Sequence, residues 1–178
     1  AGAVLSAKNF IRNNADILIL FGDVPLITLS SLRKLINNYN KNNNLGVMLA
    51  FNTIQPFAYG RVITKGKIVK KVIEEIKATS EIKKISLCNS GVMICKYKLL
   101  YSFINKIDNN NIKKEKYLPD IFKICHDKNI SFRYILCHEH EMLGVNTLED
   151  FNKIDEIYQD QLKQKLVTNG VKILNPKS

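Results

Sequence analysis

Two short apolar runs on either side of a segment with helical spacing constrain the fold of this chain most strongly. Residues 17–21 and 47–51 are continuous apolar runs of strand length, and apolar residues recur at helical spacing through 29–40. This strand–helix–strand unit predicts an α/β fold with a mostly parallel sheet, in which the first run is a buried parallel strand. Gly22 and Asp23 follow that strand directly, at the edge where open α/β sheets place their chemistry.

The rest of the chain continues the alternation of helices and strands. Gly66, which can adopt a positive φ angle, predicts a hairpin turn between strands at 61–63 and 68–69. Asn146 is expected to cap a long final helix that runs to about residue 165, because Glu149 follows three positions later. Further helices are expected at 3–11, 97–107 and, after a connection at 108–111, 118–127, and further strands at 85–95 and 132–137.

The length and composition suit a protein with one main domain. The 178 residues are 46% hydrophobic and 24% charged, as in an ordinary globular protein. We expect one partial domain over 1–146, then a C-terminal helix and linker over 147–178 whose tail at 170–176 is strand-like. The chain has no apolar run of the roughly 18 residues that cross a bilayer and no signal-peptide pattern, which predicts a cytoplasmic protein without a membrane partner. Its cysteines form no CxxC pair and are expected to be reduced core residues: Cys88, Cys95, Cys125 and Cys137.

The formal charge of +11 raises the question of an anionic partner. The excess comes from lysines spread along the whole chain, and no basic stripe with interleaved aromatic residues is present. We therefore expect no nucleic-acid partner, although basic nucleic-acid binding remains a rival hypothesis. An anionic small substrate fits the charge equally well.

Two segments contain residue types that bind metal ions. Asp23 closes a predicted strand, where a carboxylate can hold a hard cation such as Mg²⁺, and Gly22 would let a substrate approach the backbone. The alternative for this segment is a simple strand-ending turn. His138 and His140 alternate with acidic residues and would share one face of a strand, but a third converging ligand is not evident, so we expect no metal site there.

The residues around Asp23 carry a family resemblance. Phe-Gly-Asp-Val-Pro-Leu-Ile at 21–27 resembles the GDxP element of sugar nucleotidyltransferases, and closely resembles that of the bifunctional N-acetylglucosamine-1-phosphate uridyltransferase family. Four further matches follow in the family's order: Tyr-Gly-Arg at 59–61, Ile-Glu at 73–74 with Ala-Thr at 78–79, Asn-Ser-Gly at 89–91 and Gly-Val-Asn at 144–146. The resemblance implies a Rossmann-like mixed, mostly parallel sheet of the nucleotide-diphospho-sugar transferase type.

The resemblance also implies roles for single residues. Asp23 and Asn146 would hold Mg²⁺, the backbone of Gly60 would contact the sugar nucleotide, and Glu74 and Asn89 would bind the amino sugar. Without the resemblance, each has a plainer interpretation: Glu74 as a solvated hairpin charge, Asn89 as a turn former and Asn146 as a helix cap.

The activity implied is transfer of a uridylyl group from UTP to N-acetylglucosamine 1-phosphate, giving UDP-N-acetylglucosamine for cell-wall peptidoglycan. Ile76 and Lys77 replace the family's Lys and Asp, and Pro119 replaces a Thr hydroxyl, which weakens the case for turnover. In the family pattern a Gly-rich phosphate loop precedes Ala1 and an acetyltransferase β-helix follows the linker.

We therefore expect an N-terminally truncated enzyme that binds UTP poorly alone and has no acetyltransferase activity. Exposed sheet edge would favour a complementary N-terminal polypeptide or self-association. The rival hypothesis is a non-catalytic remnant or assembly partner.

Overall fold

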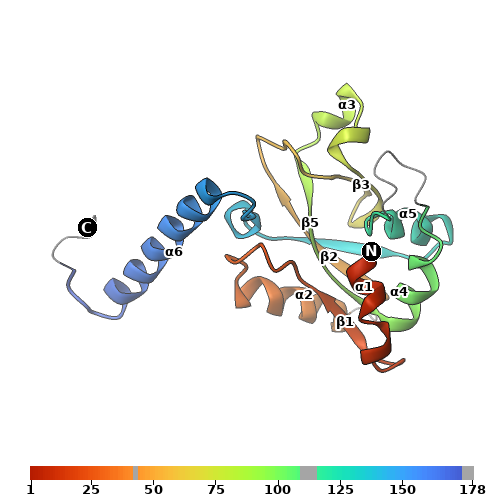
Figure 1. Cartoon of the computed structure of the whole chain (residues 1–178), viewed down its shortest axis with the longest axis horizontal. Coiled ribbons are helices and arrows are strands. Elements are labelled where there is room, and N and C mark those ends of the chain that lie inside the picture. The colour runs from red at the N-terminus through yellow and green to blue at the C-terminus, as the bar shows by residue number, and fades with distance from the viewer. Residues whose placement is uncertain (42–43, 109–115, 174–178) are drawn as a thin grey trace.

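A mixed six-stranded sheet with helices on both faces forms the body of the protein (Figure 1). The computed structural model describes residues 1–41, 44–108 and 116–173. The strand order is β1-β5-β2-β6-β4-β3, with an additional contact between β5 and β3. The strands are β1 (Asp16–Ile19), β2 (Gly46–Asn52), β3 (Arg61–Lys65), β4 (Ile68–Ile73), β5 (Leu87–Lys96) and β6 (Phe132–Leu136). The expected α/β class is confirmed.

The strand pairing differs from the expected, mostly parallel one. β2 and β6 pair in parallel, whereas β5 runs antiparallel to both β1 and β2, and β4 is antiparallel to β3 and β6. β1, β2 and β6 thus share one direction, but β5 lies between β1 and β2. The prediction of a buried parallel strand at 17–21 was wrong: within the described residues β1 pairs with β5 alone, and Leu20 and Phe21 are 46% and 47% exposed.

Alternation along β2 divides the core into two layers. Met48 and Ala50 face the cluster that contains α4 (Tyr97–Ile104) and α5 (Asp120–Asp127). Val47 and Leu49 face the cluster under α2 (Leu29–Lys41). All of these strand residues are fully buried, so the sheet is covered on both faces. The short α1 (Gly2–Ser6) packs on the α4 and α5 side, and η1 (Lys8–Phe10) follows it.

The hairpin forms where the sequence predicts it. β3 and β4 pair in antiparallel register around a turn in which Gly66 has φ +58°. That angle lies in the left-handed region, which Gly adopts without steric cost. The hairpin leads through η2 (Glu75–Lys77) and α3 (Ser80–Lys83) into β5.

The long C-terminal helix begins one residue later than expected. α6 (Leu148–Thr168) extends to one side of the sheet, away from α4 and α5 (Figure 1). Its N-cap is Thr147, whose Oγ1 accepts from the Asp150 N–H at 3.1 Å, while Asp150 Oδ2 accepts from the Thr147 N–H at 2.9 Å. The prediction that Asn146 is the cap was wrong, because the hydroxyl and carboxylate of a capping box lie at 147 and 150.

Other expectations concern less regular parts of the chain. Cys88, Cys95 and Cys125 are buried and Cys137 is half-buried, and all are free thiols, as predicted. Most of the connection at 108–111 and the end of the 170–176 tail lie outside the described residues. Among the helices that the structure describes, none is long and apolar enough to cross a membrane.

Candidate active site

Three of the predicted site residues meet at one cavity of about 680 Å³. Gly60, Glu74 and Asn89 line it, and the Asn89 N–H donates to the Gly60 carbonyl at 2.8 Å. A Cβ at residue 60 would lie 2.8 Å from Val72 Cγ1 and 3.4 Å from both Glu74 carboxylate oxygens. Glycine is therefore required for the close approach of these segments, and the Glu74 carboxylate lies directly beside the buried backbone of Gly60.

Glu74 lies at the end of β4, half-buried in the cavity wall. Burial raises its pKa above the ordinary value, and the nearby Asp120 carboxylate raises it further, while Lys77 opposes both effects. Glu74 is thus not a solvated hairpin charge. A half-buried carboxylate beside open space is suited to hydrogen bonds with hydroxyl or amide groups of a ligand.

Asn89 lies within strand β5 rather than in a turn, and it also lines the cavity. Its Oδ1 accepts from the Gly91 N–H at 2.9 Å, where the pairing of β5 with β2 shifts register. Gly91 has φ +78°, and a Cβ there would fall 1.7 Å from Phe21 Cε2. The Asn-Ser-Gly segment therefore packs directly against Phe21, the first residue of the Phe-Gly-Asp segment.

Asp23 and Asn146 are brought together by the backbone. The Val145 N–H donates to the Asp23 carbonyl at 2.8 Å, and both candidate ligands have exposed side chains. A Cβ at Gly144 would be 3.7 Å from the Asp23 carbonyl oxygen and also 3.7 Å from Asn146 Nδ2. The two residues thus lie on the same side of the molecule, on adjacent segments.

Gly22 and Asp23 line a second cavity, of about 580 Å³, between this loop and α6. Phe21 lines the first cavity, so the Phe-Gly-Asp segment separates the two. No cluster of three or more His, Cys, Asp or Glu side chains is placed to hold a metal in the described ranges. Asp23 and Asn146 alone offer one carboxylate and one amide oxygen, which are hard donors of the kind that Mg²⁺ shares with substrate phosphates and water. Their chemistry fits that ion.

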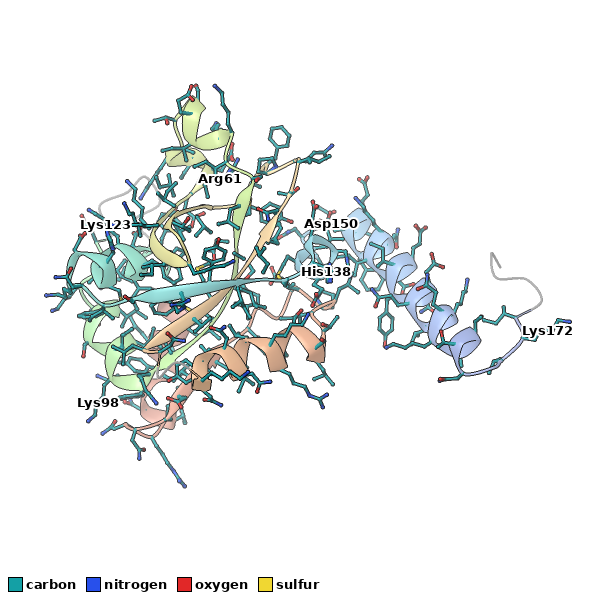
Figure 2. All side chains as sticks on the ribbon, turned by 180° about the vertical axis from the view of Figure 1, so that it is seen from behind. Arg61, Lys98, Lys123, His138, Asp150 and Lys172 are labelled. Atoms are coloured by element: carbon teal, nitrogen blue, oxygen red, sulfur yellow. The ribbon has the colours of Figure 1, made fainter. Side chains whose placement is uncertain are left out.

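The His-Glu-His-Glu segment is not a strand. β6 ends at Leu136, and η3 (Glu139–Met142) follows as a 3-10 helix near the start of α6, close to the labelled His138 in Figure 2. The idea of alternate residues on one strand face was wrong, because the chain leaves the sheet before His138.

Sequence reasoning missed two buried charged residues that support the site. Arg61 is 1% exposed where β3 meets β5 (Figure 2), and it forms an ion pair with Glu75 at 2.6 Å. Glu141 is also 1% exposed and accepts three hydrogen bonds. The only signal for Arg61 was its place after Gly60, and no sequence feature singled out Glu141.

One departure from the family pattern, Pro119, lines the first cavity. Lys77 Nζ lies 5.1 Å from the centroid of the Tyr117 ring, and Tyr117, Leu118 and Pro119 line the cavity. Pro119 contributes no hydroxyl there. Burial raises the pKa of Asp120, while the nearby Lys77 and Lys123 lower it. Lys77 therefore lowers the pKa of both Glu74 and Asp120.

Solved structures with a similar fold define the fold class. Apo UDP-glucose pyrophosphorylase superposes with a TM-score of 0.67 at 14% identity, covering 89% of this chain and 59% of that one. CMP:2-keto-3-deoxy-manno-octonic acid synthetase complexed with CTP superposes with a TM-score of 0.61 at 11% identity, covering 90% of this chain and 68% of that one. The fold is that of the nucleotide-diphospho-sugar transferases.

The chain is similar in sequence to bifunctional GlmU proteins over nearly its whole length. The chain is 37% identical to the bifunctional protein GlmU of Bartonella bacilliformis over its whole length, covering 40% of that protein. It is 38% identical to that of Thermosipho melanesiensis, over 99% of this chain and 38% of the relative. No family model matches the chain. The chain spans about two fifths of the length of these relatives, and the resemblance carried by its motifs is confirmed.

Proposed function

We propose that this chain is a sugar nucleotidyltransferase that provides the sugar-binding and metal-binding sides of the site for making UDP-N-acetylglucosamine. The convergence of Gly60, Glu74 and Asn89 on one cavity carries the proposal. The similarity to GlmU proteins supports the choice of UTP and N-acetylglucosamine 1-phosphate as substrates. We assign residues 1–146 to a partial nucleotidyltransferase domain and 147–178 to a C-terminal helix and linker.

In this reaction a phosphate oxygen of the sugar phosphate attacks the α-phosphorus of UTP, and pyrophosphate leaves. The attacking oxygen is already ionised at neutral pH, so no general base is needed. The work of the protein is to orient the reactants. Glu74 and Asn89 would bind sugar hydroxyl and acetamido groups, while the Gly60 backbone lets the sugar nucleotide approach the wall.

Asp23 and Asn146 would hold Mg²⁺ beside the phosphates. When bound there, the ion would neutralise negative charge on the reacting phosphate groups. The exposed carboxylate of Asp23 and amide of Asn146 on adjacent segments support this assignment. The 178 residues contain no Gly-rich phosphate loop, so we assign no triphosphate-binding residues among them.

A second candidate is a role in assembly through the open side of β1. Within the described residues β1 pairs on one side only, and Ile17, Ile19 and Phe21 line the apolar part of the first cavity. An apolar strand with unpaired backbone groups can accept a further strand.

Calorimetric titration with UDP-N-acetylglucosamine and Mg²⁺ tests the first candidate. Glu74→Gln and Asp23→Ala should each weaken binding by at least tenfold, whereas Asp127→Asn, at the far end of α5, should not. Binding heats that neither site variant changes would refute the site. Co-purification of a stable heteromer without ligand binding would favour the assembly role instead.

A further inference from the structure

Glu141 has an environment that its exposed acidic neighbours do not share. Its side chain is 1% exposed, and an ionised carboxylate is retained at such a position only when it is well hydrogen-bonded. Its oxygens accept from the Thr28 N–H at 2.9 Å, the Ser31 hydroxyl at 2.9 Å and the His138 N–H at 3.3 Å. Burial raises the pKa of Glu141, but the bonds from Thr28 and Ser31 outweigh it, and the pKa is lowered.

These contacts connect the two segments that carry the candidate metal ligands. Thr28 lies just beyond the Asp23 loop, at the start of α2, and Glu141 lies just before Asn146. The same segments are joined again by the Val145 N–H, which donates to the Asp23 carbonyl at 2.8 Å. The Glu141 hydrogen bonds and the Val145–Asp23 hydrogen bond therefore join the two segments at two points, and Asp23 and Asn146 lie near the second.

We propose that Glu141 is a positioning residue that sets the separation of Asp23 and Asn146, and through it the affinity of this site for a divalent cation. The proposal rests on the proposed function, because it needs those two residues to be the ligands. Glu141 acts from a distance and does not touch the ion. With the Glu141 link broken, the Val145–Asp23 bond alone would leave the loop free to pivot.

Glu141→Gln is the sharpest test, because it keeps the size of the side chain. One carboxylate oxygen becomes an NH₂ group, which cannot accept from the Thr28 N–H or the Ser31 hydroxyl. Supporting groups behind metal ligands typically change metal affinity by about 10- to 100-fold. We expect at least a tenfold weaker Kd for Mn²⁺, measured by electron paramagnetic resonance on the full chain with saturating UDP-N-acetylglucosamine.

Glu139→Gln is the matched control. Glu139 lies in the same 3-10 helix, but it is exposed and accepts from the Thr53 hydroxyl at 2.5 Å, away from the Asp23 loop. Its substitution should leave the Mn²⁺ affinity unchanged. All titrations are made at a temperature where circular dichroism shows each variant fully folded, so that a loss of stability alone does not move the Kd.

The outcomes separate the two proposals. No Mn²⁺ binding, or binding that Asp23→Ala does not weaken, overturns the metal site itself. Weaker binding in Asp23→Ala with wild-type binding in Glu141→Gln overturns the positioning role only. If Glu141→Gln does not fold, Ser31→Ala decides: it removes one bond to the carboxylate and should weaken Mn²⁺ binding, whereas Ser30→Ala should not. Equal affinities for those two variants would refute the role.

Discussion

The close approach at Gly60 predicts that adding a single methyl group will destabilise the fold and disturb the cavity. In Gly60→Ala the new Cβ would lie 2.8 Å from Val72 Cγ1, closer than carbon atoms pack, and 3.4 Å from both Glu74 oxygens. Val72 is 7% exposed within the main core, so it has little room to move. Overpacking of this kind costs about 1–3 kcal/mol of unfolding free energy. For a chain of this size that is a fall in Tm of roughly 2–12 °C.

The source of the strain can be tested in a double-mutant cycle. Val72→Ala removes the atom that the new methyl group meets, so Gly60→Ala should cost less than about 0.5 kcal/mol in that background. Urea unfolding followed by circular dichroism measures all four variants. Gly22→Ala is the control, because a Cβ there would meet nothing within 4 Å. A Gly60→Ala chain as stable as wild type, or equally destabilised in both backgrounds, would refute the steric reasoning.

Three further predictions concern charge and capping. Because the pKa of Glu74 is raised, its ionisation opposes folding as the pH rises. Glu74→Gln should therefore be more stable than wild type to urea at pH 7, and the difference should shrink in acid. Equal stability of the two proteins at both pH values would contradict this. The pKa of Glu141 is lowered, so its ionisation stabilises the fold, and this stabilisation is present above the unfolded pKa and lost as the pH falls through the folded pKa. Glu141→Gln should therefore lose less stability in acid than wild type. Thr147→Ala should lower the free energy of unfolding by about 1 kcal/mol, because it removes the cap of α6. Asn146→Ala should leave it within about 0.5 kcal/mol of wild type. A larger loss at Asn146 than at Thr147 would show that Asn146 is the cap.

Much of the secondary structure could be predicted because its signals are local. The apolar run at 47–51 became β2, helical spacing at 29–40 became α2, and Gly66 marks the hairpin turn. Side-chain periodicity reports which face of an element is buried, and neighbours along the chain determine it. The order of the family-like motifs was enough to place Gly60, Glu74 and Asn89 in one candidate site.

Strand pairing and buried charge could not be predicted in the same way. The run at 17–21 is as apolar as a central strand, yet β1 pairs only with the antiparallel β5 in the part of the chain described. Residues 138–141 were expected to lie along a strand, yet Glu141 lies in a 3-10 helix and is buried against the start of α2. The pairing of β1 and the burial of Glu141 both depend on contacts with residues that are distant in the sequence.

The sequence by itself determined the helices and strands, the α/β class and the residues that resemble a sugar nucleotidyltransferase site. The tertiary structure alone decided that Gly60 lies against Glu74, that the Asp23 and Asn146 segments meet through Val145, and that Glu141 joins them. The physical reason is the range of the interactions. Periodicity and turn preference act between near neighbours, whereas close packing and the satisfaction of a buried carboxylate need partners that only the folded chain brings together.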